Sequence, residues 1–183
     1  MPFHFTSVRS PEGLTIIEPY TFGDERGFFM ETYRQDEFAK AGIEDKFIQD
    51  NHSRSAKGVI RGLHYQVDPS EQSKLVRCVR GEIFDVALDL RMKSPTFGEW
   101  YGLVLSEENK KMFHVPRGFA HGYSTLSDIA EVVYKVDEFY SREDERGIRF
   151  DDPKLAIEWR VFNPVVSSKD KALPRFDEKG EYF

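Results

Sequence analysis

The chain has 183 residues, of which 39% are hydrophobic and 14% aromatic. This composition is typical of a packed globule and excludes a disordered chain, and the length suits one domain spanning residues 1–183. The formal net charge of −6 argues against a nucleic-acid-binding surface, which needs a basic patch. An anionic ligand would therefore require arginines and lysines gathered locally in a cleft.

Targeting signals and disulfides are not expected. No apolar run is long enough to span a bilayer, and the start, MPFHFTSVRS, lacks the basic and then apolar pattern of a secretory signal. The lone cysteine, Cys78, has no partner for an internal disulfide, and its apolar surroundings favour a small core residue over a nucleophile. We therefore expect a cytoplasmic protein that does not interact with membranes.

The predicted elements, taken in chain order, are mostly short strands. Only residues 36–42 (DEFAKAG) have the pattern of a short helix, with Gly42 as its stop. Further strands are expected within 75–90 and at 101–106, 112–116 and 130–140. This series predicts an all-β sandwich or barrel of jelly-roll type. The polar tail from Asn163 onward is either a loose end or a segment that packs back over the barrel.

Within 75–90 the side chains alternate between two faces. One face carries Phe84, Val86, Leu88 and Leu90, and the other carries Ile83, Asp85, Ala87 and Asp89.

Residues 58–66 (GVIRGLHYQ) form an apolar strand that contains an arginine, a histidine and a glutamine. On an ideal strand Arg61 and His64 point to opposite faces. Both can reach one ligand only if the strand bulges or ends between them, and Gly62 is where we expect this.

Two of the five histidines have unusual settings: His64 in this apolar strand, and His121 after the turn-forming PRGFA. Together they resemble half of the metal-binding pattern of cupins, G-x5-H-x-H followed by P-x-G-x2-H. Gln66 stands where that pattern has its second histidine. Two imidazoles are fewer than the three or four protein ligands of a usual metal site, so a metal is not favoured.

Proton transfer remains as the alternative chemistry, because neither a nucleophile elbow nor a glycine-rich phosphate loop is present. A histidine serves as a general base when a carboxylate fixes its tautomer. A tyrosine facing it could return the proton, and Tyr134 is a candidate. Spacing alone favours the other reading, in which Tyr134 is a core aromatic whose hydroxyl bonds the backbone.

Several motifs together resemble the dTDP-4-dehydrorhamnose 3,5-epimerase family. They are GDERGFFMET (23–32), QDNHSRSAKGVIRGLHYQ (49–66), KLVRCVRGEIFDVALDLR (74–91), SPTFGEW (94–100), LSEEN (105–109), VPRGFAHGYSTLS (115–127), YK (134–135), ERGIRFDDP (145–153) and SSKD (167–170). They cover nearly the whole chain in the family's order, and RGLHYQ and PxGFAHG are the most specific.

The resemblance implies a cupin-like jelly roll and a homodimer with no cofactor and no metal. It implies epimerisation of dTDP-4-dehydro-6-deoxy-D-glucose at C3 and C5, through an enolate, in dTDP-L-rhamnose biosynthesis. By their place in the motifs, His64 matches the general base, Asp170 its carboxylate, Tyr134 the general acid and Lys74 the cation beside the reacting carbonyl. Substrate-binding positions are matched by Arg26, Glu31, Gln49, Asp50, Asn51, Arg61, His121, Tyr140, Glu145 and Lys169. Of these, Arg26 and Glu31 correspond to positions that reach the site from the partner subunit.

Two departures from the family's pattern are visible. Phe150 stands where the family usually has tryptophan before the DDP turn, and Arg160 follows Trp159 where proline is usual. Other functions stay open besides the 3,5-epimerase. They are an enzyme that inverts only C3 or uses another 4-keto-6-deoxy nucleotide sugar, a metal-dependent cupin, and a non-catalytic sugar-binding jelly roll.

Overall fold

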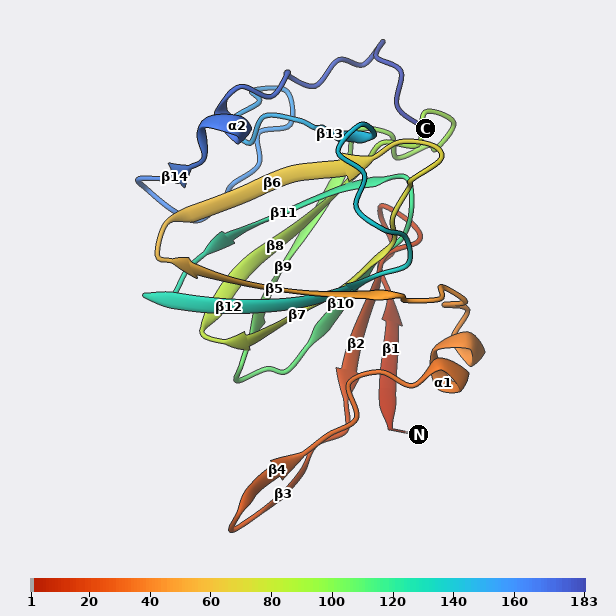
Figure 1. Cartoon of the computed structure of the whole chain (residues 1–183), viewed down its shortest axis with the longest axis vertical. Helices are drawn as coiled ribbons and strands as arrows, with labels where there is room; N and C mark the ends of the chain where they lie inside the picture. Colours follow the sequence, from red (N-terminus) through yellow and green to blue (C-terminus); the bar gives the residue numbers. More distant parts are fainter. Residues whose placement is uncertain (1) are drawn as a thin grey trace.

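Two facing antiparallel sheets make up the body of the molecule (Figure 1). The computed structural model describes residues 2–183. The first sheet has the order β1 (Phe3–Ser7), β2 (Thr15–Pro19), β10 (Met112–Val115), β7 (Lys74–Arg80), β12 (Ile129–Val136) and β5 (Gln49–Ala56). The second has the order β13 (Glu145–Gly147), β6 (Val59–Gln66), β11 (Phe119–Thr125), β8 (Glu82–Asp89) and β9 (Trp100–Ser106), with β14 (Val165–Val166) parallel to β6. The predicted all-β, cupin-like jelly roll is confirmed.

The predicted elements are found with shifted boundaries. The expected helix is α1 (Gln35–Lys40), and Gly42 beyond it has φ +85°. The stretch 75–90 is two strands, because the chain crosses at Gly81 from β7 in the first sheet to β8 in the second. The strand expected over 130–140 ends at Val136. There the Asp137 carboxylate accepts a hydrogen bond from the backbone N–H of Ser73, which turns the chain away from the ladder.

The two faces of β8 pack into different layers, as the alternation predicts. Ile83 and Ala87 belong to the core between the sheets. Phe84, Val86 and Leu88 face the other side, where the C-terminal segment covers them. The tail therefore packs back over the barrel, the second of the two alternatives.

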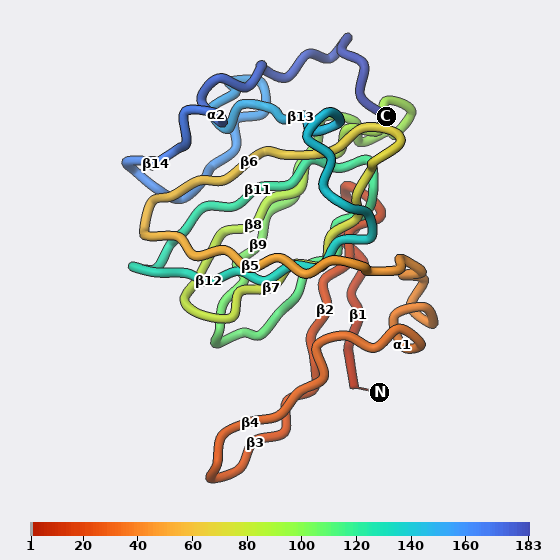
Figure 2. Tube along the Cα trace, viewed as in Figure 1, coloured from red at the N-terminus to blue at the C-terminus, as the bar shows by residue number. Residues whose placement is uncertain are grey.

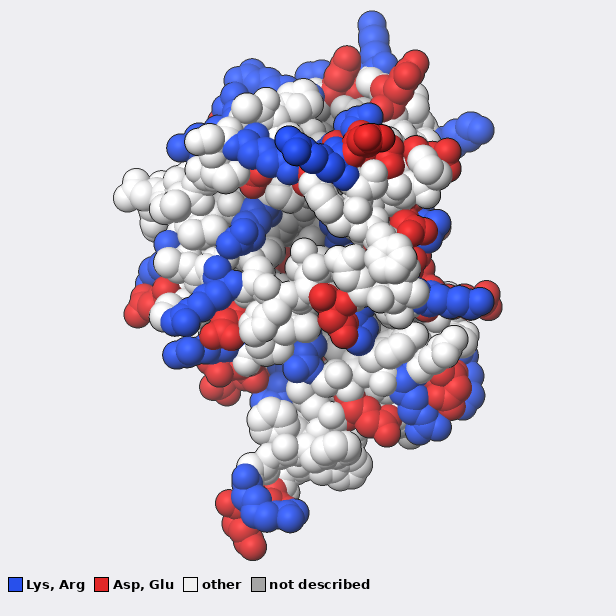
Figure 3. All heavy atoms as spheres, viewed as in Figure 1, with Lys and Arg blue, Asp and Glu red and all other residues white. Residues whose placement is uncertain are grey.

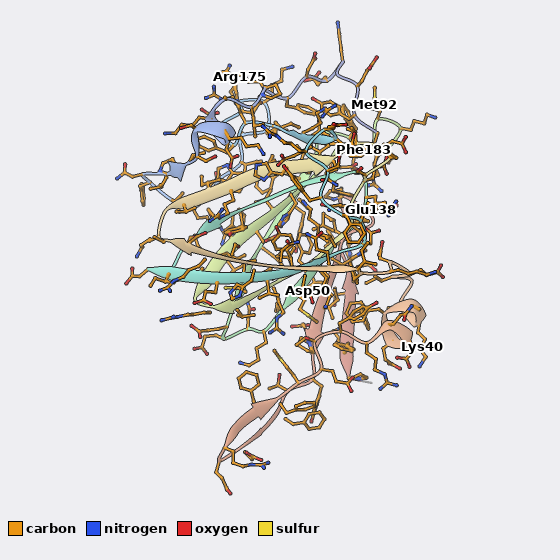
Figure 4. The ribbon with its side chains drawn as sticks, in the orientation of Figure 1. Lys40, Asp50, Met92, Glu138, Arg175 and Phe183 are labelled. Carbon is orange, nitrogen blue, oxygen red and sulfur yellow. The ribbon has the colours of Figure 1, made fainter. Side chains whose placement is uncertain are left out.

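The C-terminal segment is held by its aromatic residues. Trp159 is buried and donates a hydrogen bond from Nε1 to the carbonyl of Phe150 (2.7 Å), and the Arg160 guanidinium lies 4.2 Å from the centre of the Phe84 ring. Phe183, labelled in Figure 4, lies against the ring of Tyr65. Both departures from the family's pattern thus take part in packing this layer.

A hairpin of β3 (Phe22–Asp24) and β4 (Gly27–Phe29) extends from the body as an arm (Figures 1 and 2). Its side chains Phe22, Phe28 and Phe29 are 59%, 61% and 68% exposed. Phe22 packs against Tyr20 and the Lys110 ammonium lies over the Phe28 ring, so the side chains of this arm are only partly covered by their own chain.

None of the helices in the described part of the chain is both long and apolar enough to cross a membrane.

Candidate active site

A cavity of about 500 Å³ opens between the two sheets and is lined by residues of both. Figure 3 shows this face of the molecule hollowed, with Lys and Arg side chains beside the hollow. The first sheet contributes Lys74 and Tyr134, the second His64 and His121, and the C-terminal segment Asp170. The structure therefore brings together residues that are far apart in the sequence.

A register shift in β6 places Arg61 and His64 at the same cavity. His121 and Tyr123, two residues apart on β11, pair with His64 and Arg61, which are three residues apart on β6. The segment of β6 between these pairs therefore contains one extra residue. Gly62, inside the shifted segment, has φ +118°. The predicted irregularity at Gly62 is confirmed.

His64 is paired with the carboxylate that the motif suggested. Its Nε2 lies 2.9 Å from Oδ1 of Asp170, and the other oxygen, Oδ2, accepts from the backbone N–H of Gly62 at 3.3 Å. Asp170 lies in the short helix α2 (Ser168–Lys171), where its N–H donates to the Ser167 hydroxyl that caps this helix.

This environment keeps Asp170 charged. Burial alone would raise the pKa of its carboxyl, but the hydrogen bond and charge of His64, with the N–H of Gly62 and the hydroxyl of Ser167, hold the pKa below its usual range. A charged Asp170 accepts a hydrogen bond from the Nε2–H of His64 and so leaves the lone pair of the imidazole on Nδ1, as a general base requires.

Tyr134 lines the cavity from β12, in the opposite sheet from His64. Burial raises the pKa of its phenol, the nearby phenol of Tyr123 adds to this, and Arg61 counteracts it. Tyr134 therefore stays protonated at neutral pH, as a general acid must.

Lys74 lies in the wall of the same cavity. Its Nζ is 3.4 Å from the backbone carbonyl of His64. Burial lowers the pKa of Lys74 to about 8, against the opposing charges of Asp85 and Glu145. The lysine is thus a cation near neutral pH, positioned where negative charge on a bound carbonyl could be stabilised.

His121 forms a second histidine–carboxylate pair, which the sequence analysis missed. Its Nε2 lies 2.8 Å from Oδ1 of Asp85, a fully buried residue of β8. Oδ2 of Asp85 is buried and has no hydrogen-bond partner among the described residues. An aspartate on the apolar face of Ile83 and Ala87 was the signal that could have revealed this pair.

A second, smaller cavity of about 180 Å³ adjoins the first and shares His64, Lys74 and Tyr134 with it. Its further lining includes the predicted positions Gln49, Asn51, Tyr140 and Glu145.

Glu145 connects the rim of this smaller cavity to α2. The Tyr140 hydroxyl donates to Oε2 of Glu145 at 2.7 Å, and the Lys169 ammonium donates to the same oxygen. Burial would raise the pKa of Glu145, but the hydrogen bonds from Lys169 and Tyr140 lower it.

Three predicted residues lie elsewhere. Asp50 alternates with Gln49 and Asn51 along β5, so its side chain is on the outer face, where it accepts from Lys135 at 2.8 Å (labelled in Figure 4). Asp50 therefore lines neither cavity of its own chain. Arg26, on the arm, is paired with Asp24, and neither it nor Glu31 lines the cavity of its own chain.

Gln66, at the position of the missing histidine ligand, serves the fold. Its amide donates to the carbonyls of Ser70 and Phe139 and accepts from the N–H of Ser141. Within residues 2–183, no three His, Cys, Asp or Glu side chains converge as a metal-ligand set. The two cavity histidines instead bond carboxylates through Nε2.

Comparisons with known proteins agree with this geometry. The family model described as dTDP-4-dehydrorhamnose 3,5-epimerase matches residues 10–178. A relative of that name from Shigella flexneri is 59% identical over 169 residues, which are 92% of this chain and 93% of the relative.

Solved structures show the same likeness. The crystal structure of dTDP-4-dehydrorhamnose 3,5-epimerase from Elizabethkingia anophelis is 44% identical with a TM-score of 0.92 and covers 98% of this chain and 99% of its own. The epimerase from Legionella pneumophila in complex with dTDP-4-keto-L-rhamnose is 46% identical with a TM-score of 0.89, covering 96% and 99%. With the His64–Asp170 pair facing Tyr134 in a jelly roll of this topology, the chain belongs to the dTDP-4-dehydrorhamnose 3,5-epimerase family.

Proposed function

We propose that residues 1–183 act as one epimerase domain that converts dTDP-4-dehydro-6-deoxy-D-glucose into dTDP-4-dehydro-L-rhamnose, in dTDP-L-rhamnose biosynthesis. The observation that carries the proposal is one cavity holding a carboxylate-paired His64, a protonated Tyr134 and a Lys74 cation. The Legionella relative, solved with dTDP-4-keto-L-rhamnose, supports the choice of sugar nucleotide.

The reaction follows from the acidity of the carbons that flank a carbonyl. His64 takes the proton from C3 or C5, and the electrons move into an enolate with its charge on O4. Lys74 stabilises that oxygen, and a preorganised cation at a developing oxyanion typically contributes several kcal/mol. Tyr134 then gives a proton to the opposite face of the same carbon, which inverts it.

After each inversion the histidine is protonated and the tyrosine is a phenolate. Both exchange with solvent to regain their starting states, so the same pair can act on the second carbon. Proton transfer by positioned groups contributes about 10²–10⁴-fold to such rates.

The remaining predicted residues would hold the nucleotide and sugar. Arg61 and Lys169 supply cations that suit a diphosphate. Gln49, Asn51, His121, Tyr140 and Glu145 supply polar and aromatic contacts along the two cavities.

We further propose that the protein is a homodimer whose arms complete each other's sites. The exposed aromatic side chains of β3 and β4 support this, because apolar groups that extend into water are typical of an interface. Arg26 and Glu31, on and beside the arm, would then reach the partner's cavity. The free, buried thiol of Cys78 suits a reducing cytoplasm.

Solvent deuterium exchange tests the function. The wild-type protein in D₂O should incorporate deuterium at C3 and C5 of dTDP-4-dehydro-6-deoxy-D-glucose, and His64→Asn should lose at least about 10²-fold of this rate. His52→Asn is the matched control, because His52 lies on the outer face of β5, paired with Glu131, and should exchange at the wild-type rate. Full-rate exchange by His64→Asn would exclude His64 as the base.

Product analysis by NMR separates the proposal from its closest alternative. Inversion at both carbons is expected, whereas a product inverted only at C3 would reassign the chain to the C3-specific reaction. Exchange abolished by EDTA would instead favour a metal-dependent cupin, and nucleotide binding without exchange would favour a sugar-binding protein.

A further inference from the structure

A cluster of hydroxyl groups connects the two sheets at the wall of the cavity, and the reaction above does not use it. The Tyr123 hydroxyl, from β11 of the second sheet, lies 2.9 Å from Oγ of Ser53 and 3.3 Å from Oγ of Ser55. Both serines belong to β5 of the first sheet. Tyr123 is only 4% exposed, yet it and Ser53 line the cavity.

Arg61 is attached to the same cluster. Its Nε donates to Oγ of Ser55 at 3.0 Å, and its Nη2 donates to the backbone carbonyl of Arg54 at 3.3 Å. A guanidinium has five N–H groups, so these contacts occupy two of them and leave three for a ligand. Ser55 thus bridges Arg61 and Tyr123.

This bridge matters because Arg61 is otherwise weakly constrained. Its side chain is exposed at the cavity and starts from the shifted part of β6. A free arginine side chain has about 2 kcal/mol of rotamer entropy, and ordering it on binding reduces affinity. A guanidinium already fixed on Ser55 avoids much of that loss.

We propose that Tyr123 is a positioning residue, which acts through Ser55 to hold Arg61 in the orientation that binds the substrate's diphosphate. The inference rests on the proposed function in that it takes the ligand to be a dTDP-linked sugar. Tyr123 has no role in the family motifs described above. The proposal gives it a role shared with Ser55, which lies in the opposite sheet.

Tyr123→Phe removes only the bridging hydroxyl and is the central test. We expect about tenfold weaker binding of dTDP by calorimetry, a similar rise in KM and a kcat within about twofold of wild type, because the diphosphate is held equally in the ground and transition states. Ser55→Ala should reproduce this split.

Tyr101→Phe is the matched control. Tyr101 packs in the same core against Phe113, but its hydroxyl is outside the cluster, so its dTDP affinity should stay at the wild-type value. A Tyr123→Phe protein that binds dTDP as wild type does would overturn the proposal, even if its melting temperature falls.

A double-mutant cycle with Arg61→Ala tests whether Tyr123 acts through Arg61. Once Arg61 is removed, Tyr123→Phe should cause no further loss of dTDP affinity. Additive losses would contradict the proposal, since Tyr123 would then act by another route. The double-mutant cycle measures dTDP binding and does not depend on catalysis. If the proposed function is wrong, the wild-type protein will exchange no deuterium, and this result is independent of the cycle.

Discussion

His64 depends on a carboxylate 106 residues further along the chain. Asp170 is almost fully buried, and it remains charged because His64, Gly62 and Ser167 all bond it. At the residue scale, the reactivity of this imidazole is therefore decided by a group that fixes its tautomer and stabilises its protonated form.

Asp170→Asn should lower the rate of deuterium exchange by about 10²–10⁴-fold, because a neutral amide cannot stabilise the imidazolium. The same substitution at Asp45 is the control, since Asp45 bonds Nε2 of His114 at the same distance of 2.9 Å but outside the catalytic cavities. Equal exchange rates in the two variants would contradict the role of Asp170.

Lys74 gives the reaction its dependence on pH. The group is a cation below a pKa of about 8 and neutral above it, so kcat/KM for epimerisation should fall as the pH rises through about 8. The phenol of Tyr134 does not explain such a fall, because burial raises its pKa above the ordinary value of 10. A pH–rate profile that stays level to pH 10 would contradict a rate-limiting loss of the Lys74 charge at a pKa of about 8.

At the scale of elements, β6 owes its shape to Gly62. A side chain there would place its Cβ 2.6 Å from the Cα of Gly122 and 2.8 Å from the carbonyl oxygen of His121, and the φ of +118° disfavours any other residue. The close approach of β6 and β11 and the shared direction of Arg61 and His64 therefore both need glycine at this position.

Gly62→Ala should lower the free energy of unfolding by more than the roughly 1–2 kcal/mol that a left-handed backbone costs an alanine. Gly42→Ala isolates that backbone cost, because Gly42 has φ +85° and a Cβ added there would have no atom within 4 Å. Urea unfolding at one fixed protein concentration compares the two variants. Equal destabilisation would show that the contact with β11 costs nothing.

For the whole molecule, the proposed dimer makes the arm a part of the partner's site. Its phenylalanines are more than half exposed in their own chain, and Arg26 lies away from the cavity of its own chain. A dimer with exchanged arms accounts for both observations, since a two-fold interface buries the same surface of each subunit.

Mixing two inactive variants tests this exchange. Arg26→Ala keeps His64, and His64→Ala keeps the arm, so a mixed dimer has one complete site if the arms cross. Refolding the two in equal amounts should restore about a quarter of the wild-type number of sites, by random pairing. No recovery of epimerase activity would contradict the crossed arms.

Phe29→Asp provides a second measure of the dimer. It should shift the sedimentation of the protein towards the monomer, because a charge would be buried in the interface. Phe162→Asp is its control, since Phe162 is fully exposed on the body and lies outside the arm. Equal masses for both variants would argue against the arm as the interface.

Local pattern was enough to predict α1, the strands β6 to β10 and β12, and several residues that line the cavity. The alternation along β8 predicts which side chains enter which layer, because successive side chains on a strand must point to opposite faces. The motifs RGLHYQ and PxGFAHG identified His64 and His121, and Gly62 was expected at the irregularity. The same alternation would have placed Asp50 on the outer face, had residues 49–56 been recognised as a strand.

The amino-acid sequence was thus sufficient for part of the strand pattern, for the likeness to a family and for the chemical types at the site. The motifs had suggested the pair of Asp170 with His64, but the contacts of Asp85 with His121 and of Tyr123 with Ser55 could be found only from the folded chain. The physical reason is that these contacts join separate strands or sheets, through residues 36 to 106 positions apart in the chain. Their geometry depends on register, on the shift in β6 and on how the C-terminal segment folds back, none of which periodicity along one strand can specify.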